Sequence, residues 1–212
     1  MNLLKLTYRY LQPNPIRSFL SILVCLLRGR RSHALKVIRV DPQNIKQWLT
    51  PKEDPGIVRS WPGQVMGGKW HIHAKNIESC DSSEDVDCLK QTAFYERFYV
   101  GKSWGETGLF KNYYRKKILL GPVRGKENLE DLLKFYEGVY ESIYEDIKIN
   151  GVRVPTLSDP EPTFIHVHMG PNGEVIASDN GNHRIAIARQ LGLRSIPVKI
   201  LRLHKSAKDH VF

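Results

Sequence analysis

Apolar side chains recur at intervals of three and four residues along the middle of the chain, which is the spacing of an amphipathic helix. This pattern predicts one helix over residues 128–149 and another over residues 81–97. Ser103 and Glu106 have the spacing of a capping box, so a further helix is expected to run from there to about Gly121-Pro122. The tyrosines on these helices are interpreted as packing residues rather than as a platform for stacked bases.

Alternation of polar and apolar residues over 163–169, a Gly-Pro-Asn-Gly turn and a return at 174–177 predict a β-hairpin. Two more strands are expected, one near Val37 and one at residues 197–201. A loop rich in proline and glycine is expected at residues 49–68. The fold class is therefore α+β, with a small mixed sheet on which the central helices pack.

Two pairs of histidines have the His-x-His spacing. Alternation in the hairpin places Phe164, His166 and His168 on one strand face, and Ile165, Val167 and Met169 on the other. His71 and His73 form the second pair. Such a pair can ligate a metal, but no carboxylate stands at a defined spacing as a third ligand. Structural or surface histidines are the favoured interpretation.

A tight turn opens directly into an Ala-rich helix after the hairpin. The start of a helix offers unpaired amide groups and the positive end of a dipole. Gly181 lets the backbone approach a ligand closely, and the guanidinium of Arg184 adds a planar set of donors. With Asn182 and His183 between them, these residues predict a site for an anion, and for phosphate in particular. The alternative is a helix capped by Asp179 or Asn180, with Arg184 in solvent.

The order of elements around this turn resembles the ParB/sulfiredoxin-like superfamily. The Gly-x-His-Arg turn is followed by a short helix, then by Leu191-Gly192-Leu193 and by Ile196-Pro197-Val198-Lys199-Ile200. The resemblance covers residues 147–204, and residues 36–40 are similar to the family's first strand. In that superfamily the turn grips nucleotide phosphates, so the resemblance implies a nucleotide ligand and a ParB/sulfiredoxin-like sheet.

Individual branches of the superfamily differ from this chain at recognisable places. Sulfiredoxin has a catalytic cysteine where this chain has Asn182, so its chemistry is not expected here. Chromosome-partition members continue into a helix-turn-helix region, which the end of the chain at Phe212 leads us not to expect. The free-serine kinases have an Asp-Gly-x-His-Arg turn, whereas Asp179 stands two residues before the glycine, which weakens any metal role for it.

A narrower resemblance is to an uncharacterised group of microbial proteins in the same superfamily. It rests on Gly67-Gly68-Lys69-Trp70, Glu96-Arg97-Phe98, Gly101-x-x-Trp104-x-Glu106-Thr107 and Arg202-Leu203-His204-Lys205. The group has Gly-Gly-Asp-Trp-Asp at the first motif, where this chain has Lys69 and His71. If those acids hold a metal or act as bases, the activity is lost or altered here.

A net charge of +10 over 212 residues favours an anionic partner such as a nucleotide, nucleic acid, anionic lipid or acidic glycan. Small basic clusters stand at residues 28–31 and 115–117, but most of the charge is dispersed, so DNA is a weaker expectation. The three cysteines have no zinc-site spacing. Their odd number argues against a disulfide framework and for a reducing compartment, with a Cys80–Cys88 bond left open.

The N-terminus has a separate pattern, an apolar helical face bounded by arginines. Its uncharged run over residues 18–27 is ten residues long, whereas a membrane span needs about 20. We therefore expect a helical arm at 1–34 and one domain at 35–212, with a helical insertion at about 70–125. The arm either packs on the domain or lies on an anionic membrane through residues 16–31, so the protein is expected to be cytoplasmic or peripheral at a membrane.

Three functions follow as hypotheses. The first is a phosphotransferase that uses ATP or CTP with magnesium to modify a small-molecule or sugar-like hydroxyl. Its phosphate cradle is Gly181, Asn182, His183 and Arg184. Its catalytic candidates are Asp179, which is also the magnesium candidate, His183, Arg184 and Glu53. Glu53 lies roughly where the related serine kinases have a base, or else is a solvent-facing loop residue. The second is a nucleotide-sensing module without turnover, and the third is a nucleic-acid binder or nuclease; the oligomeric state is left open.

Overall fold

The computed structural model describes residues 37–49, 51, 53–56, 63–77, 86–154 and 164–210. The expected arm at residues 1–34, and with it the membrane alternative for residues 16–31, lies outside these ranges. Among the helices that are described, none is both long enough and apolar enough to cross a bilayer.

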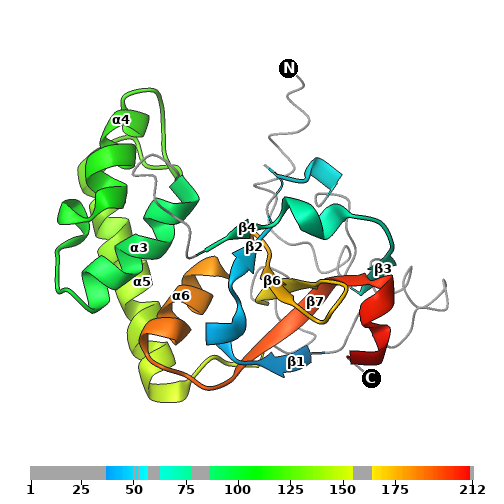
Figure 1. Ribbon diagram of the computed structural model, residues 1–212. Coiled ribbons are helices and arrows are strands. Elements are labelled where there is room, and N and C mark those ends of the chain that lie inside the picture. The colour runs from blue at the N-terminus through cyan, green and yellow to red at the C-terminus, as the bar shows by residue number, and fades with distance from the viewer. Residues whose placement is uncertain are drawn as a thin grey trace, which may run out of the picture.

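A mixed seven-stranded sheet runs through the described chain in the order β1-β7-β5-β6-β2-β4, with β3 paired to β7 off this path (Figure 1). β7 is the central strand, since it pairs antiparallel with β1 and parallel with both β5 and β3. The strands are β1 (Val37–Val40), β2 (Gln47–Trp48), β3 (Gln64–Met66), β4 (Lys75–Asn76), β5 (His166–Met169), β6 (Val175–Ala177) and β7 (Ile196–His204). The α+β class, the first strand, the hairpin and the last strand are thereby confirmed.

Three strands differ from the sequence expectation. β2 and β4 are two residues long, too short for any alternation to be recognised. β3 lies inside residues 49–68, so the prediction of a continuous loop there is wrong for Gln64–Met66. It forms because β7 continues to His204, where its backbone pairs with this segment.

The predicted alternation in the hairpin is also observed in the core. Ile165, Val167 and Met169 all belong to the buried cluster beneath the sheet, together with Ile196, Val198 and Ile200 of β7. His166 and His168 lie opposite Lys199 and Arg202 of β7, with an irregularity in the register between Val167 and His168. The two histidines therefore lie along the polar positions of the central strand, as alternation predicts.

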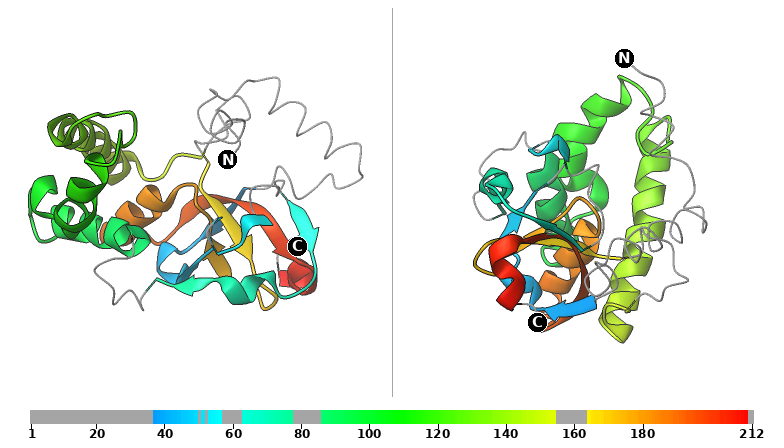
Figure 2. Two further views of the ribbon diagram at one scale, coloured as in Figure 1. Left: turned by 90° about the horizontal axis from the view of Figure 1, so that it is seen from above. Right: turned by 90° about the vertical axis from the view of Figure 1, so that its right-hand side faces the viewer.

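The helices gather to one side of the sheet, and both Figure 1 and the view from above in Figure 2 show α6 between that helical lobe and the strands. α5 matches the predicted long helix: the side chain of Asn128 accepts a hydrogen bond from the amide of Asp131, and the helix ends at Gly151 with φ of 71°. The helices are α3 (Val86–Phe98), α4 (Arg115–Ile118), α5 (Leu129–Asn150) and α6 (Asn182–Gln190).

α6 is apolar on both sides because two cores meet on it. Ile185 and Ala188 pack in the core of the sheet, whereas Ala186 and Ile187 pack with the aromatic residues of α3 and α5. Its neighbours on both sides thus fix the position of its first turn.

The helix predicted from Ser103 onward is divided into three segments. Its capping box is confirmed, because Glu106 accepts hydrogen bonds from the amide and the hydroxyl of Ser103. The box opens only a short 3-10 turn, Trp104–Glu106, which is followed by a π-helix, Leu109–Tyr114, and then by α4. The division lets Leu109, Phe110 and Tyr114 all be buried.

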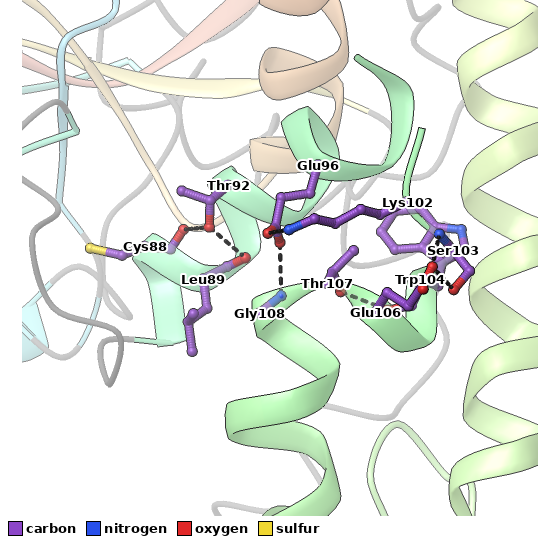
Figure 3. A network of polar contacts seen from close by, with 10 residues as sticks. All are labelled: Cys88, Leu89, Thr92, Glu96, Lys102, Ser103, Trp104, Glu106, Thr107 and Gly108. Carbon is purple, nitrogen blue, oxygen red and sulfur yellow. Dashed lines mark hydrogen bonds and ion pairs between the residues drawn. The ribbon is translucent and has the colours of Figure 1, made fainter. Parts of the chain in front are cut away.

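Residues of the narrower sequence resemblance hold this turn together (Figure 3). Glu96 accepts a 2.7 Å hydrogen bond from the amide of Gly108 and pairs with Lys102. The hydroxyl of Thr107 donates to the carbonyl of Trp104, whose side chain is fully buried. These contacts give the motif a structural role, which is to join α3 to the π-helix.

Cys88 is buried at the start of α3 and is disulfide-bonded. The sequence argument against a disulfide framework therefore fails for this residue, for which a bond had been left open. Cys25 and Cys80 lie outside the described residues. A disulfide is unusual in a reducing compartment, so this bond counts against the argument from the odd number of cysteines.

Candidate functional site

The predicted anion site lies where α6 begins. Gly181 is the N-cap residue, with φ of 92° and ψ of 5°, and no side chain caps the first turn. The alternative in which Asp179 or Asn180 caps the helix is therefore wrong. Asp179 is exposed and accepts a hydrogen bond from the hydroxyl of Ser178, while the carbonyl of Asn180 accepts one from the amide of His166.

Gly181 is needed for a reason that the sequence did not reveal. A Cβ at this position would lie 2.8 Å from the Cα of Ile165 and 3.0 Å from its Cγ1. From the sequence, Gly181 was expected to let the backbone approach a ligand closely. In the structure its backbone instead packs closely on Ile165, the residue just before β5. A left-handed conformation and the absence of a side chain are both required here.

His183 turns into the helical lobe. Its ring centroid lies 4.6 Å from that of Tyr140 and 5.2 Å from that of Phe94. Burial, followed by the charges of Arg124, Lys90 and Arg184, lowers the pKa of His183 to about 3. The imidazole is therefore neutral at physiological pH, and its buried Nε2 has no hydrogen-bond partner.

A small cavity opens beside His183. Its volume is about 10 Å³, which is room for about one water molecule. Asn182 and His183 line it from α6, and Lys90 lines it from α3. The Oδ1 of Asn182 and the Nε2 of His183 are both buried and lack hydrogen-bond partners. A water at this place could donate a hydrogen bond to the Oδ1 and pair with the Nε2, and so satisfy both atoms.

Arg124 approaches the same histidine from the turn before α5. Its backbone has φ of 52°, and Gly125 follows with φ of 74° in a turn closed by hydrogen bonds between Val123 and Lys126. The guanidinium carbon lies 5.8 Å from the ring centroids of both Tyr136 and Tyr140. One of these two rings, Tyr140, also contacts His183.

Burial lowers the pKa of Arg124, but the neighbouring Tyr136, Tyr140 and Tyr114 outweigh it and raise the value. The guanidinium therefore stays charged. Burial also raises the pKa of Tyr140 to about 12, so this tyrosine remains a neutral phenol. The Tyr114 and Tyr136 hydroxyls share a 2.6 Å hydrogen bond in the core, which confirms that these tyrosines are packing residues.

Arg184 is half-buried in the first turn of α6. Desolvation and the charge of Arg153, just after the end of α5, both lower the pKa of Arg184. Arg184 acts electrostatically on His183 but does not line the small cavity. The predicted residues thus differ in their surroundings. Asn182 and His183 line the cavity, whereas Arg184 lies outside it and is influenced by the charge of Arg153.

Glu53 lies near β4 and not in open solvent. Its carboxylate pairs with the Nζ of Lys75 at 3.1 Å, and its side chain is 6% exposed. The interpretation of Glu53 as a solvent-facing loop residue is thus wrong. The ion pair holds this carboxylate beside β4, and Glu53 does not line the cavity between α3 and α6.

One histidine of each predicted pair, His71 and His168, belongs to a separate aromatic cluster with Trp70 and His204. His168 is fully buried, and its ring centroid lies 5.8 Å from that of Trp70. The Nε2 of His204 donates a 3.0 Å hydrogen bond to the carbonyl of Gly68, and its Nδ1 accepts one from the amide of Ser206. The Nε2 of His204 must therefore carry the proton. Arg202 pairs with Asp54 at the edge of this cluster.

The described residues were compared with the donor groups that hold metal ions in proteins. No group of three or more His, Cys, Asp or Glu residues in these ranges could hold an ion. Asp179 contributes one exposed carboxylate, so a magnesium ion held here would take its other ligands from water and from the phosphates of a bound nucleotide. The role of Asp179 as a magnesium ligand stays a prediction.

Lys90, Arg124 and Arg153 were not recognised from the sequence. They come from α3, from the turn before α5 and from the segment after α5, and each has an ordinary polar sequence context. Only the Arg124-Gly125 turn carried a local signal, and that signal concerned the backbone. Comparisons with family models, with curated proteins and with solved structures found no match for this chain.

Proposed function

We propose that the protein binds the phosphate groups of a nucleotide, ATP or CTP, at the N-terminus of α6. The observation that carries the proposal is the convergence of three cations on His183. Lys90 lines the same cavity as His183. Arg124 lies over the ring of Tyr140, which also contacts His183, and Arg184 follows His183 in the first turn of α6. The three cations come from three separate elements. They converge at the N-terminus of α6, which is the positive end of the helix dipole and where no described side chain caps the amides of the first turn.

An anion at this place would be attracted by all three cations and by the positive end of the helix dipole. Partly buried charges are screened by salt much less than exposed ones, so this attraction would persist at physiological ionic strength. The hydrogen bonds that charged groups form contribute about 1.5–3 kcal/mol each.

The size of the cavity limits how the ligand sits. A space for one water is too small for a phosphate group. We therefore infer that the phosphate lies at the opening, against the first-turn amides and the arginines. A bridging water in the cavity then donates to the Oδ1 of Asn182 and joins the Nε2 of His183 to the phosphate.

Binding without turnover is the form of this function that the geometry favours. Phosphotransfer requires a group that positions the acceptor hydroxyl and a cation that bridges the phosphates. His183 is neutral and enclosed by aromatic rings, Glu53 is paired with Lys75, and the described carboxylates form no metal site. We propose a ParB/sulfiredoxin-like domain that senses a nucleotide, with phosphotransfer to a small-molecule hydroxyl as the second candidate, supported by its resemblance to the serine kinases.

A thermal-shift titration with ATP and with CTP tests the proposal, with and without magnesium. A ligand at about 100 times its Kd stabilises the native state by about 2.7 kcal/mol, or several degrees in a chain of this size. We expect Arg184→Ala and Arg124→Ala to abolish the shift. Arg194→Ala is the matched control, because Arg194 is an exposed arginine after the opposite end of α6.

Equal nucleotide shifts in Arg184→Ala, Arg124→Ala and Arg194→Ala would show that the nucleotide binds elsewhere. Absence of any shift in the wild-type protein would reject the proposal. Release of ADP or CDP in the presence of candidate hydroxyl acceptors would favour the phosphotransferase instead.

A further inference from the structure

The outer end of the helical lobe carries an exposed pair of leucines next to a run of cations. Leu119 and Leu120 are 84% and 82% exposed. Arg115, Lys116 and Lys117 of α4 are also exposed and directly precede them. Figure 1 shows α4 at the end of the lobe that lies farthest from β1 and β7. We call residues 115–120 the basic leucine tip.

Folding of the lobe does not account for these side chains. The preceding π-helix already supplies the buried residues of this segment, Leu109, Phe110 and Tyr114. α4 itself contributes no buried residue. Isolated exposed leucines are common on protein surfaces, but two adjacent ones at a tip add apolar area that no other described residue covers.

Acidic residues near the tip are already engaged in contacts of their own. Glu130 pairs with Lys134 at 2.7 Å, and Asp131 accepts hydrogen bonds from the Asn128 side chain and, through its own amide, donates one back. These contacts belong to the first turn of α5. The charge presented by α4 is thus positive, through three consecutive cationic side chains.

We propose that the basic leucine tip docks on an anionic membrane surface. A projecting pair of leucines can enter the boundary between headgroups and acyl chains, and lysine and arginine beside it attract anionic lipids. A flat protein partner would be expected to need a larger apolar area than two side chains provide. This proposal is independent of the nucleotide site and of the N-terminal residues 16–31.

Vesicle flotation with the full chain tests the proposal. We expect binding to mixed phosphatidylcholine–phosphatidylserine vesicles and little binding to phosphatidylcholine alone. Each cation near the membrane contributes about a fivefold change in affinity, so Lys116→Ala/Lys117→Ala should weaken binding at least about tenfold. Leu119→Ala/Leu120→Ala should also weaken it about tenfold or more, because each substitution removes apolar groups that would enter the membrane.

Ile149→Ala is the matched control, since Ile149 is a 76% exposed apolar residue near the end of α5. The N-terminal residues are the same in every variant, so differences between variants report on the tip. A blue shift of the added tryptophan emission in Leu120→Trp, absent in Ile149→Trp, would show insertion directly. Equal binding by wild type and by the double leucine variant, no binding by wild type, or equal binding to both vesicle types would each overturn the proposal.

Discussion

Replacing Gly181 by alanine tests the backbone geometry on which the site depends. Two effects add at this position. The residue has φ of 92°, a conformation that L side chains rarely adopt, and the new Cβ would lie 2.8 Å from the Cα of Ile165. Because the contact is with backbone, it cannot be relieved by the rotation of a side chain.

The expected loss of stability can be worked out from these two effects. A non-glycine residue in the left-handed region costs about 1–2 kcal/mol, and forcing extra volume into a packed region costs about 1–3 kcal/mol more. The sum is about 3 kcal/mol, which lowers the Tm of a chain of this size by about 6–12 °C.

Gly192→Ala separates the two effects. Gly192 follows the end of α6, has φ of 64°, and has no atom within 4 Å of a Cβ built on it. Alanine there should cost only the conformational term, about 1–2 kcal/mol. Urea unfolding of both variants measures the difference. If Gly181→Ala is as stable as Gly192→Ala, the close packing of the turn on Ile165 is refuted.

Three further outcomes are expected. His168 is fully buried, and burial, followed by the charges of Arg202 and His166, lowers its pKa to about 3. As the pH falls, the unfolded state therefore takes up a proton at this residue before the folded state does. The free energy of unfolding should fall as the pH drops below about 6.5, by about 2 kcal/mol at pH 5. Urea unfolding at pH 7 and pH 5 measures the change. His183, whose pKa is also lowered to about 3, should contribute a similar amount, so His168→Gln should remove about half of the total difference. A pH dependence that is unchanged in this variant contradicts the prediction. The denatured, unreduced chain should titrate with one free thiol, since Cys88 is disulfide-bonded and the chain has three cysteines; three free thiols would show that the bond does not form. DNA affinity should be weak, with a shallow dependence on salt; a steep dependence in a fluorescence anisotropy titration would favour a nucleic-acid binder.

The sequence predicted those elements whose pattern is long enough to read. α5 has 22 residues of helical spacing, an Asn128 cap and a terminal Gly151, so propensity, capping and periodicity agree. The hairpin and β7 were found because alternation and turn residues coincide. β2, β3 and β4 have two or three residues each, and their pairing depends on the position of β7 and β6 in space.

The candidate site was predicted only in its local part. The turn before α6 and the residues Gly181 to Arg184 are contiguous, so the helix start and its arginine were recognised together. Lys90 and Arg124 join them through tertiary packing around His183, across separations of many residues. Nothing in the sequence near Lys90 distinguishes it from other surface lysines, and Gly181 itself was explained only when Ile165 was seen beside it.

Amide chemical shifts during a nucleotide titration test the central claim most directly. A phosphate group at the start of α6 should change the amide resonances of Asn182, His183 and Arg184 more than those of the aromatic cluster around His168. Inorganic phosphate should affect the same amides more weakly. Changes concentrated elsewhere in the chain, or no change with either ATP or CTP, would contradict the account.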